Sequence, residues 1–248
     1  MSQLDLATEA EVSQRHLSFL ETGRAKPSRE MVMHLSVVLD VPPRERNQLL
    51  GAAGFSPTHP EHGLDEPAMD QVRHVLDLML AAHHPFPAYV VDRRWDLVLS
   101  NDVAMMLTSS VATPDTMAAL GGNLARLTLH PDGIRPFTAN WEEAATVLLQ
   151  RLRREARSRP TDTALAELVE EVSGYPDVGG LPEADPIPDG SELLIPLHLT
   201  TPLGDLRFYT MIATIGAAHD LTLEELRLET LLPADEATES VLRSLSSG

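Results

Sequence analysis

The stretch from Gln3 to Glu21 constrains the fold of this chain more than any other part of it. Its apolar side chains recur at the spacing expected for the buried faces of two short helices: Leu6, Ala7, Ala10, Leu17 and Leu20. Ser13 is a good N-cap for the second helix, and Val12 closes the turn that precedes it. The sequence therefore predicts two short helices joined by a tight turn.

This register leaves polar side chains on the outer face of the second helix, at Gln14, Arg15 and Ser18. Arg and Gln pair well with the edges of guanine and adenine in a DNA major groove. The following turn carries Arg24 and Lys26, two cations that suit phosphate groups. An amphipathic hairpin with a merely polar surface is the alternative, but helix, turn and basic loop all fall in the register of a DNA-reading unit.

The segment Leu17–Arg24, followed by Pro27 and Ser28, resembles the lambda-repressor-like (XRE) helix-turn-helix family, and the similarity spans about Ser2 to Leu50. The resemblance implies a phosphate contact from Gln3. It also places four side chains on the face that meets the groove: Ser13, Gln14, Arg15 and Ser18.

Two features depart from the family pattern. Glu11 stands where the family has a turn glycine with positive φ, and Met1 directly precedes the first motif helix, where the family has a further helix. We therefore expect weak DNA binding by this head and a natural start codon upstream that adds the first helix.

The charge of the chain is unevenly distributed. The 248 residues carry a net charge of −18, but residues 1–55 hold six basic and seven acidic side chains, which leaves −17 for the rest. A nearly neutral head can bind DNA if its cations share one face. The absence of cysteine excludes disulfides and thiol catalysis, and neither a secretory signal nor an apolar run of about 20 residues is found, so we expect a cytoplasmic protein without a membrane span.

The order of patterns predicts two domains: a head over residues 1–55, a linker over 56–67 rich in Pro and Gly, and a second domain over 68–245. Ser28 caps a further head helix. In the second domain we expect helices from near Met69, after Asn101, and through 141–152 and 165–172. Strands are expected at 88–91, 95–100, 193–200 and 206–213, with a hairpin turn at 201–204 and a helical tail from Leu223.

The second domain resembles the ligand-binding domain of MmyB-like regulators over about residues 64–243. Three stretches carry the resemblance: Pro87–Trp95 with Asn101, Leu129–Gly133, and Leu232–Thr238. It implies a PAS-like fold with an apolar cavity that suits a fatty-acid-like molecule. The expected fold class is thus an all-α helix-turn-helix head, without its first helix, joined to an α+β PAS-like sensor domain.

Aromatic, Met and aliphatic residues of the second domain are the candidates for the cavity wall: Tyr89, Val91, Trp95, Leu97, Met105, Met106, Leu197, Phe208 and Met211. Such residues more often form an ordinary core. Met nevertheless adapts to varied guests, and Trp and Tyr bring polar tips.

Catalytic and metal sites are not indicated. The ten histidines show no HxxxH or HExxH spacing, and no GxSxG, Walker or GxGxxG motif is present. We expect no enzyme, no cofactor and no metal, read His130-Pro131-Asp132 as a turn, and read the basic run from Arg151 to Arg159 as a solvated helix face or a contact for phosphate.

The sequence as a whole predicts a homodimeric transcription regulator that binds a double-stranded DNA operator and responds to a small apolar ligand. The alternative is a ligand- or protein-binding sensor module that no longer binds DNA because its head is truncated.

Overall fold

The computed structural model describes residues 1–182, 197–215 and 220–246. These residues divide into two compact units: Met1 to His62 with Asp220 and Leu221 form the first, and the remaining residues from Gly63 onward form the second. The division lies inside the stretch 56–67 that the sequence marks as a linker; the domain boundaries themselves stay a prediction.

The first unit is helical. Its helices are α1 (Gln3–Glu9), α2 (Gln14–Glu21), α3 (Arg29–Val38) and α4 (Pro43–Ala52). The hydroxyls of Ser2, Ser13 and Ser28 each accept a hydrogen bond from a backbone N–H in the first turn of α1, α2 and α3, respectively. Between α1 and α2, Glu11 adopts φ 51°, the left-handed conformation expected of the turn glycine that it replaces.

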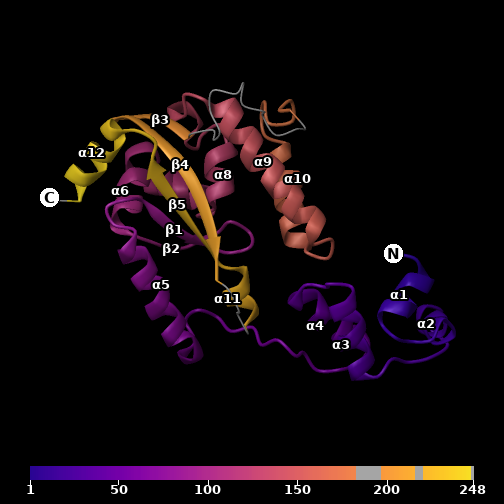
Figure 1. The fold of residues 1–248 in the computed structure, drawn as a ribbon. Coiled ribbons are helices and arrows are strands. Elements are labelled where there is room, and N and C mark those ends of the chain that lie inside the picture. Colours follow the sequence, from indigo (N-terminus) through magenta and orange to yellow (C-terminus); the bar gives the residue numbers. More distant parts are fainter. Residues whose placement is uncertain (183–196, 216–219, 247–248) are drawn as a thin grey trace. The chain divides into compact units, whose positions relative to one another are not determined.

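The second unit is an antiparallel sheet with helices on both faces (Figure 1). Its strands are β1 (Ala88–Val91), β2 (Leu97–Ser100), β3 (Leu197–Thr201), β4 (Gly204–Thr214) and β5 (Arg227–Pro233), in the order β2-β1-β5-β4-β3. Its helices are η1 (Pro67–Met69), α5 (Asp70–Ala82), α6 (Asp102–Val111), α7 (Pro114–Ala119), α8 (Leu124–Leu129), η2 (Arg135–Phe137), α9 (Trp141–Ser158), α10 (Thr163–Ser173), α11 (Leu221–Glu225) and α12 (Glu236–Leu245). The predicted fold class, an all-α head before an α+β, PAS-like domain, is confirmed.

Successive side chains of each strand point to opposite faces of the sheet, so the core of this unit has two parts. Ala88 and Val90 of β1 pack with Leu76 and Leu80 of α5 on one face of the sheet. Tyr89 and the residues in phase with it face the larger cluster, which is built with α6, α8, α9 and α10. The central strands β1 and β5 are therefore largely buried on both sides, whereas much of β4 is exposed. The larger cluster positions the cavity described below.

Most predicted elements of the second unit are present, but the expected helical tail from Leu223 is wrong. After the short helix α11, residues 227–233 form β5, which pairs with β1 on one side and β4 on the other. The charged side chains of Arg227 and Glu229 face the interior, so the strand lacks the alternation of apolar interior and polar exterior residues that would predict it. One of its two pairing partners, β1, is also more than 120 positions away in the sequence.

Two smaller differences concern the other strands. The strand expected from Trp95 begins at Leu97, because Trp95 lies in the turn with φ 66°. The strand expected over 193–200 is seen from Leu197 onward, and residues 193–196 lie outside the described part of the chain. The hairpin turn over 201–204 is present, with Thr201 opposite Gly204.

Candidate DNA-reading helix and ligand cavity

Helix α2 presents the face that the sequence assigns to base reading. Leu17 is buried and anchors the helix to the head, while Gln14 and Arg15 are exposed and Ser18 is half-buried. The Arg15 guanidinium lies 5.3 Å from the centroid of the Phe19 ring, so a ring contact restrains this long side chain. The outward face of α2 thus offers one cation and one amide to a groove.

The remaining residues predicted to contact DNA differ in their surroundings. Arg24 and Lys26 are exposed in the turn after α2. Gln3, expected to hold a phosphate, donates from Nε2 to Glu21 Oε2 at 2.7 Å, and its Oε1 accepts a long 3.4 Å hydrogen bond from Gln14 Nε2. Gln3 therefore joins the start of α1 to α2, and the second N–H of its amide is the donor left for a phosphate.

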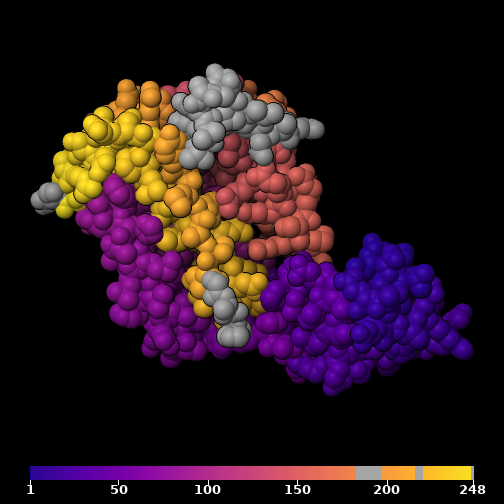
Figure 2. Space-filling model, in the orientation of Figure 1, coloured from indigo at the N-terminus to yellow at the C-terminus, as the bar shows by residue number. Residues whose placement is uncertain are grey.

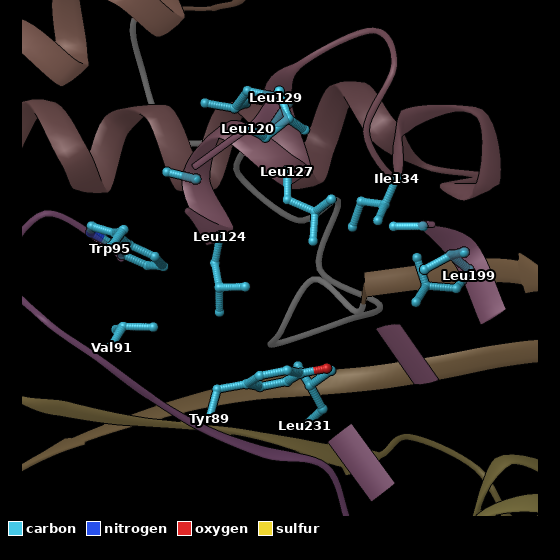
Figure 3. Close-up of a cluster of buried hydrophobic side chains, with 14 of the residues drawn as sticks. Tyr89, Val91, Trp95, Leu120, Leu124, Leu127, Leu129, Ile134, Leu199 and Leu231 are labelled. Atoms are coloured by element: carbon cyan, nitrogen blue, oxygen red, sulfur yellow. The ribbon is translucent and has the colours of Figure 1, made fainter. Parts of the chain in front are cut away.

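A cavity of about 580 Å³ lies in the second unit on the face of the sheet that α6, α8 and α9 cover. Figure 3 shows Leu124, Leu127 and Ile134 pointing from the helical side toward Tyr89 and Leu231 on the sheet. The volume falls within the range of pockets that hold small organic molecules, and the wall is mostly aliphatic and aromatic.

The lining of the cavity includes exposed residues of α9 and β4. Val147 of α9 and Met211 of β4 both border it, and they are 38% and 57% exposed. Figure 2 draws this side of the second unit, where the orange atoms of β4 adjoin the salmon atoms of the helical segment.

The structure divides the nine predicted ligand residues into three groups. Those that line the cavity are Tyr89, Trp95, Leu197 and Met211. Those that pack in the surrounding core without lining it are Val91, Leu97 and Phe208.

The expectation for the third group, Met105 and Met106, is wrong for this cavity. They are 49% and 38% exposed on α6. The buried face of that helix is formed by Val103, Ala104, Leu107, Thr108 and Val111, whose helical spacing turns the two methionines toward solvent.

Sequence reasoning missed the polar part of the cavity wall. Glu229 of β5 and Arg151 of α9 both line the cavity. Glu229 lies in β5, the strand that the sequence does not predict. Arg151 belongs to the basic run for which a solvated helix face or a phosphate contact is expected. Burial raises the pKa of Glu229 to about 7, and the nearby Arg151 cation opposes that shift.

Arg151 is one end of a network behind the wall. Its Nε donates to Glu155 Oε1 at 3.0 Å, and Arg227 Nη1 donates to Glu155 Oε2 at 2.6 Å. Trp95 Nε1 lies 3.5 Å from the same Oε2. Glu155 therefore joins α9, β5 and the turn before β2 at one end of the cavity.

Tyr89 supplies a second polar group, and its bonding is complete. Its hydroxyl lies 3.2 Å from Ala104 O and 3.0 Å from Thr108 Oγ1. Burial raises the pKa of Tyr89, so the phenol stays neutral.

His130 lies in a turn, as the sequence predicts. His130 packs edge-on against Tyr175 with ring centroids 4.8 Å apart, and its Nδ1 accepts from Asp132 N at 3.1 Å, as in a turn. Within residues 1–182, 197–215 and 220–246, no three His, Asp or Glu side chains gather as a metal site would require. None of the described helices has the length and apolar character needed to span a bilayer.

The comparisons with known proteins agree with both sites. Residues 72–245 match the family described as the MmyB-like transcription regulator ligand binding domain. The chain belongs to this family. Residues 1–46 match a helix-turn-helix family, so this MmyB-like chain joins a DNA-binding type of head to a ligand-binding domain. Both families are of regulator type, and neither describes an enzyme.

Other comparisons add little. The sequence has no significant match among curated proteins. A solved structure described as an RNA-binding light-oxygen-voltage receptor matches at 15% identity and a TM-score of 0.30, covering 99% of this chain and 57% of the other. The chain therefore spans little more than half the length of that protein.

Proposed function

We propose that this protein is a transcription regulator whose head binds a DNA operator and whose cavity binds a small apolar molecule that controls this binding. The single observation that carries the proposal is the apolar cavity of about 580 Å³, which lies within the domain that the family match assigns to ligand binding. The proposed occupant has a fatty-acid-like hydrocarbon chain, because the wall offers mainly aliphatic and aromatic surface.

For the head, we propose that Arg15 and Gln14 read base edges and that Arg24 and Lys26 bind phosphates. Exposure of all four side chains supports this assignment. Two heads of a homodimer, spaced by about one turn of DNA, would read a pseudo-palindromic operator in the cytoplasm. Ligand binding shifts the balance between DNA-competent and incompetent forms only if it favours one of them.

The test uses the full chain in two steps. DNA sites selected from a random library are titrated by fluorescence anisotropy at a fixed salt concentration, with and without the compounds extracted from the purified protein. We expect specific binding that changes at least fivefold when the extracted compound is added back. Ligand binding without any selected DNA would favour the alternative, a sensor module that does not bind DNA. Failure to bind any apolar compound would reject the cavity as a ligand site.

A further inference from the structure

One side chain of the cavity wall is not accounted for by an apolar occupant. Glu229 lies in the middle of β5, opposite Tyr89 of β1 and Ile212 of β4, and all three line the cavity. Directly opposed residues of antiparallel strands project from the same face, so the carboxyl group of Glu229 is presented to the cavity. It has no hydrogen bond or salt bridge to any described residue.

An unpaired acid is costly at such a position. A half-buried carboxyl group without a partner loses part of its hydration, a loss that an apolar side chain at the same position would avoid. Three polar groups of the wall have partners: the Tyr89 hydroxyl bonds to Thr108 and Ala104, Thr128 Oγ1 donates to Leu124 O at 2.9 Å, and Arg151 Nε donates to Glu155 Oε1 at 3.0 Å. Tyr209 and Thr210 of β4 also line the cavity. Among the described wall residues Glu229 is the acid, and its carboxyl oxygens have their bonding capacity left for a ligand.

The charges around Glu229 decide which polar group it would accept. The guanidiniums of Arg151 and Arg227 share the one carboxylate of Glu155, and the Arg159 cation also lies near Arg227. Arg227 lies two residues from Glu229 on the same face of β5, and Arg151 faces it from α9. An ionised Glu229 offsets part of this positive charge, and a neutral donor leaves that arrangement unchanged. A ligand carboxylate has no proton to donate and would repel an ionised Glu229 at close range, and a ligand ammonium would add a further cation beside Arg151 and Arg227.

We propose that the cavity holds a molecule with an apolar chain and a neutral hydrogen-bond-donating group, such as a hydroxyl, which donates to the Glu229 carboxyl. The proposal rests on the ligand-binding role of the cavity proposed above. It assigns the polar end of the ligand to Glu229 and differs in that respect from the fatty-acid carboxylate that the family resemblance implies.

The test compares three probes of equal chain length, decanol, decanoate and decylamine, by calorimetric titration of the full chain at pH 8. At this pH decanoate is anionic, decylamine is cationic and Glu229 is mostly ionised. We expect decanol to bind at least tenfold more tightly than either charged probe. Glu229→Leu removes the acceptor with little change in volume and should weaken decanol binding at least tenfold, while decanoate binding stays equal or improves.

Two further variants separate this role from general packing. Glu229→Gln keeps a carbonyl acceptor and should retain decanol binding within about threefold. Glu167→Leu makes the same change on the exposed face of α10 and should alter nothing. If decanoate or decylamine binds most tightly, or if Glu229→Leu leaves decanol binding intact, the assignment of the head group is wrong while the ligand cavity stands. If none of the three probes binds the wild type or any variant, the proposed ligand cavity fails and this inference fails with it.

Discussion

Arg227 on the central strand β5 donates a 2.6 Å hydrogen bond to Glu155 on α9, and both side chains are largely buried. The pair ties the sheet to the helix that forms one wall of the cavity. Burial lowers the pKa of Arg227, while the Glu155 carboxylate opposes that shift. The cavity is thus bounded at one end by a buried ion pair.

Removing one partner of this pair should destabilise the second unit strongly. Glu155→Leu leaves the Arg227 cation buried and should lower the free energy of unfolding by about 3–5 kcal/mol. Urea unfolding followed by tryptophan fluorescence measures this, because Trp95 and Trp141 both lie in the second unit. The double variant Glu155→Leu with Arg227→Met should recover most of the loss. A single variant within about 0.5 kcal/mol of wild type would show that the pair is not structural.

Glycine at position 11 should stabilise the head. Glu11 holds φ 51°, a conformation that costs a residue with a Cβ about 1 kcal/mol relative to glycine. Glu11→Gly should therefore slow amide hydrogen exchange in α1 and α2 by roughly fivefold, as about 1 kcal/mol implies. Glu9→Gly, two residues earlier within α1, is the matched control and should speed exchange instead. Faster exchange in both variants would contradict the argument.

How far the sequence predicts this molecule depends on the range of the interactions. The head follows from local signals: Ser13 and Ser28 cap their helices as expected, and the positive φ of Glu11 follows from the position of the turn. The strand β5 does not follow from local signals. Its hydrogen bonds join it to residues more than 120 positions away in β1, and its charged residues face inward. Missing β5 also hid Glu229 and the true wall of the cavity. Met105 and Met106 were misplaced because the helical phase of α6 depends on which face the sheet covers.

Two cations of the head should affect DNA binding in different ways. Arg15→Ala removes a base contact and should cost roughly 1–3 kcal/mol on the selected operator, with little change on random DNA. Lys26→Ala removes a phosphate contact and should weaken binding to the operator and to random DNA alike. The slope of log affinity against log salt concentration should fall by about one. Anisotropy titrations at several salt concentrations distinguish the two. Equal losses on operator and random DNA for Arg15→Ala would mean that α2 does not read bases.

Filling the cavity should abolish ligand binding without unfolding the protein. Leu148 lines the cavity from α9, so Leu148→Trp places extra atoms in empty space and should block the decyl probes while the thermal midpoint stays within a few degrees. Met105→Trp adds the same ring on the exposed side of α6 and should leave probe binding unchanged. Loss of binding in both variants, or in neither, would place the ligand elsewhere.

The last prediction concerns pH. The pKa of Glu229 rises from 4.5 to about 7 on folding, so between these values the folded chain holds a proton that the unfolded chain has released. The contribution of Glu229 to stability is therefore most favourable below pH 4.5, declines as pH rises to about 7, and is constant above that. Arg151 and Arg227 face Glu229 and keep their charge over this range, and the Tyr89 phenol stays neutral.

The full pKa shift of Glu229 corresponds to at most roughly 3 kcal/mol in the free energy of unfolding. Urea unfolding at pH 5 and pH 8, monitored by tryptophan fluorescence, should show Glu229→Gln gaining stability relative to wild type at the higher pH by up to this amount. Glu167→Gln on the surface of α10 should show no such gain, because its carboxyl group is exposed. If the difference between Glu229→Gln and wild type is the same at both pH values, or larger at pH 5, then Glu229 is not held in a dry cavity. The bonding capacity assigned to it for a ligand would then be taken up by water.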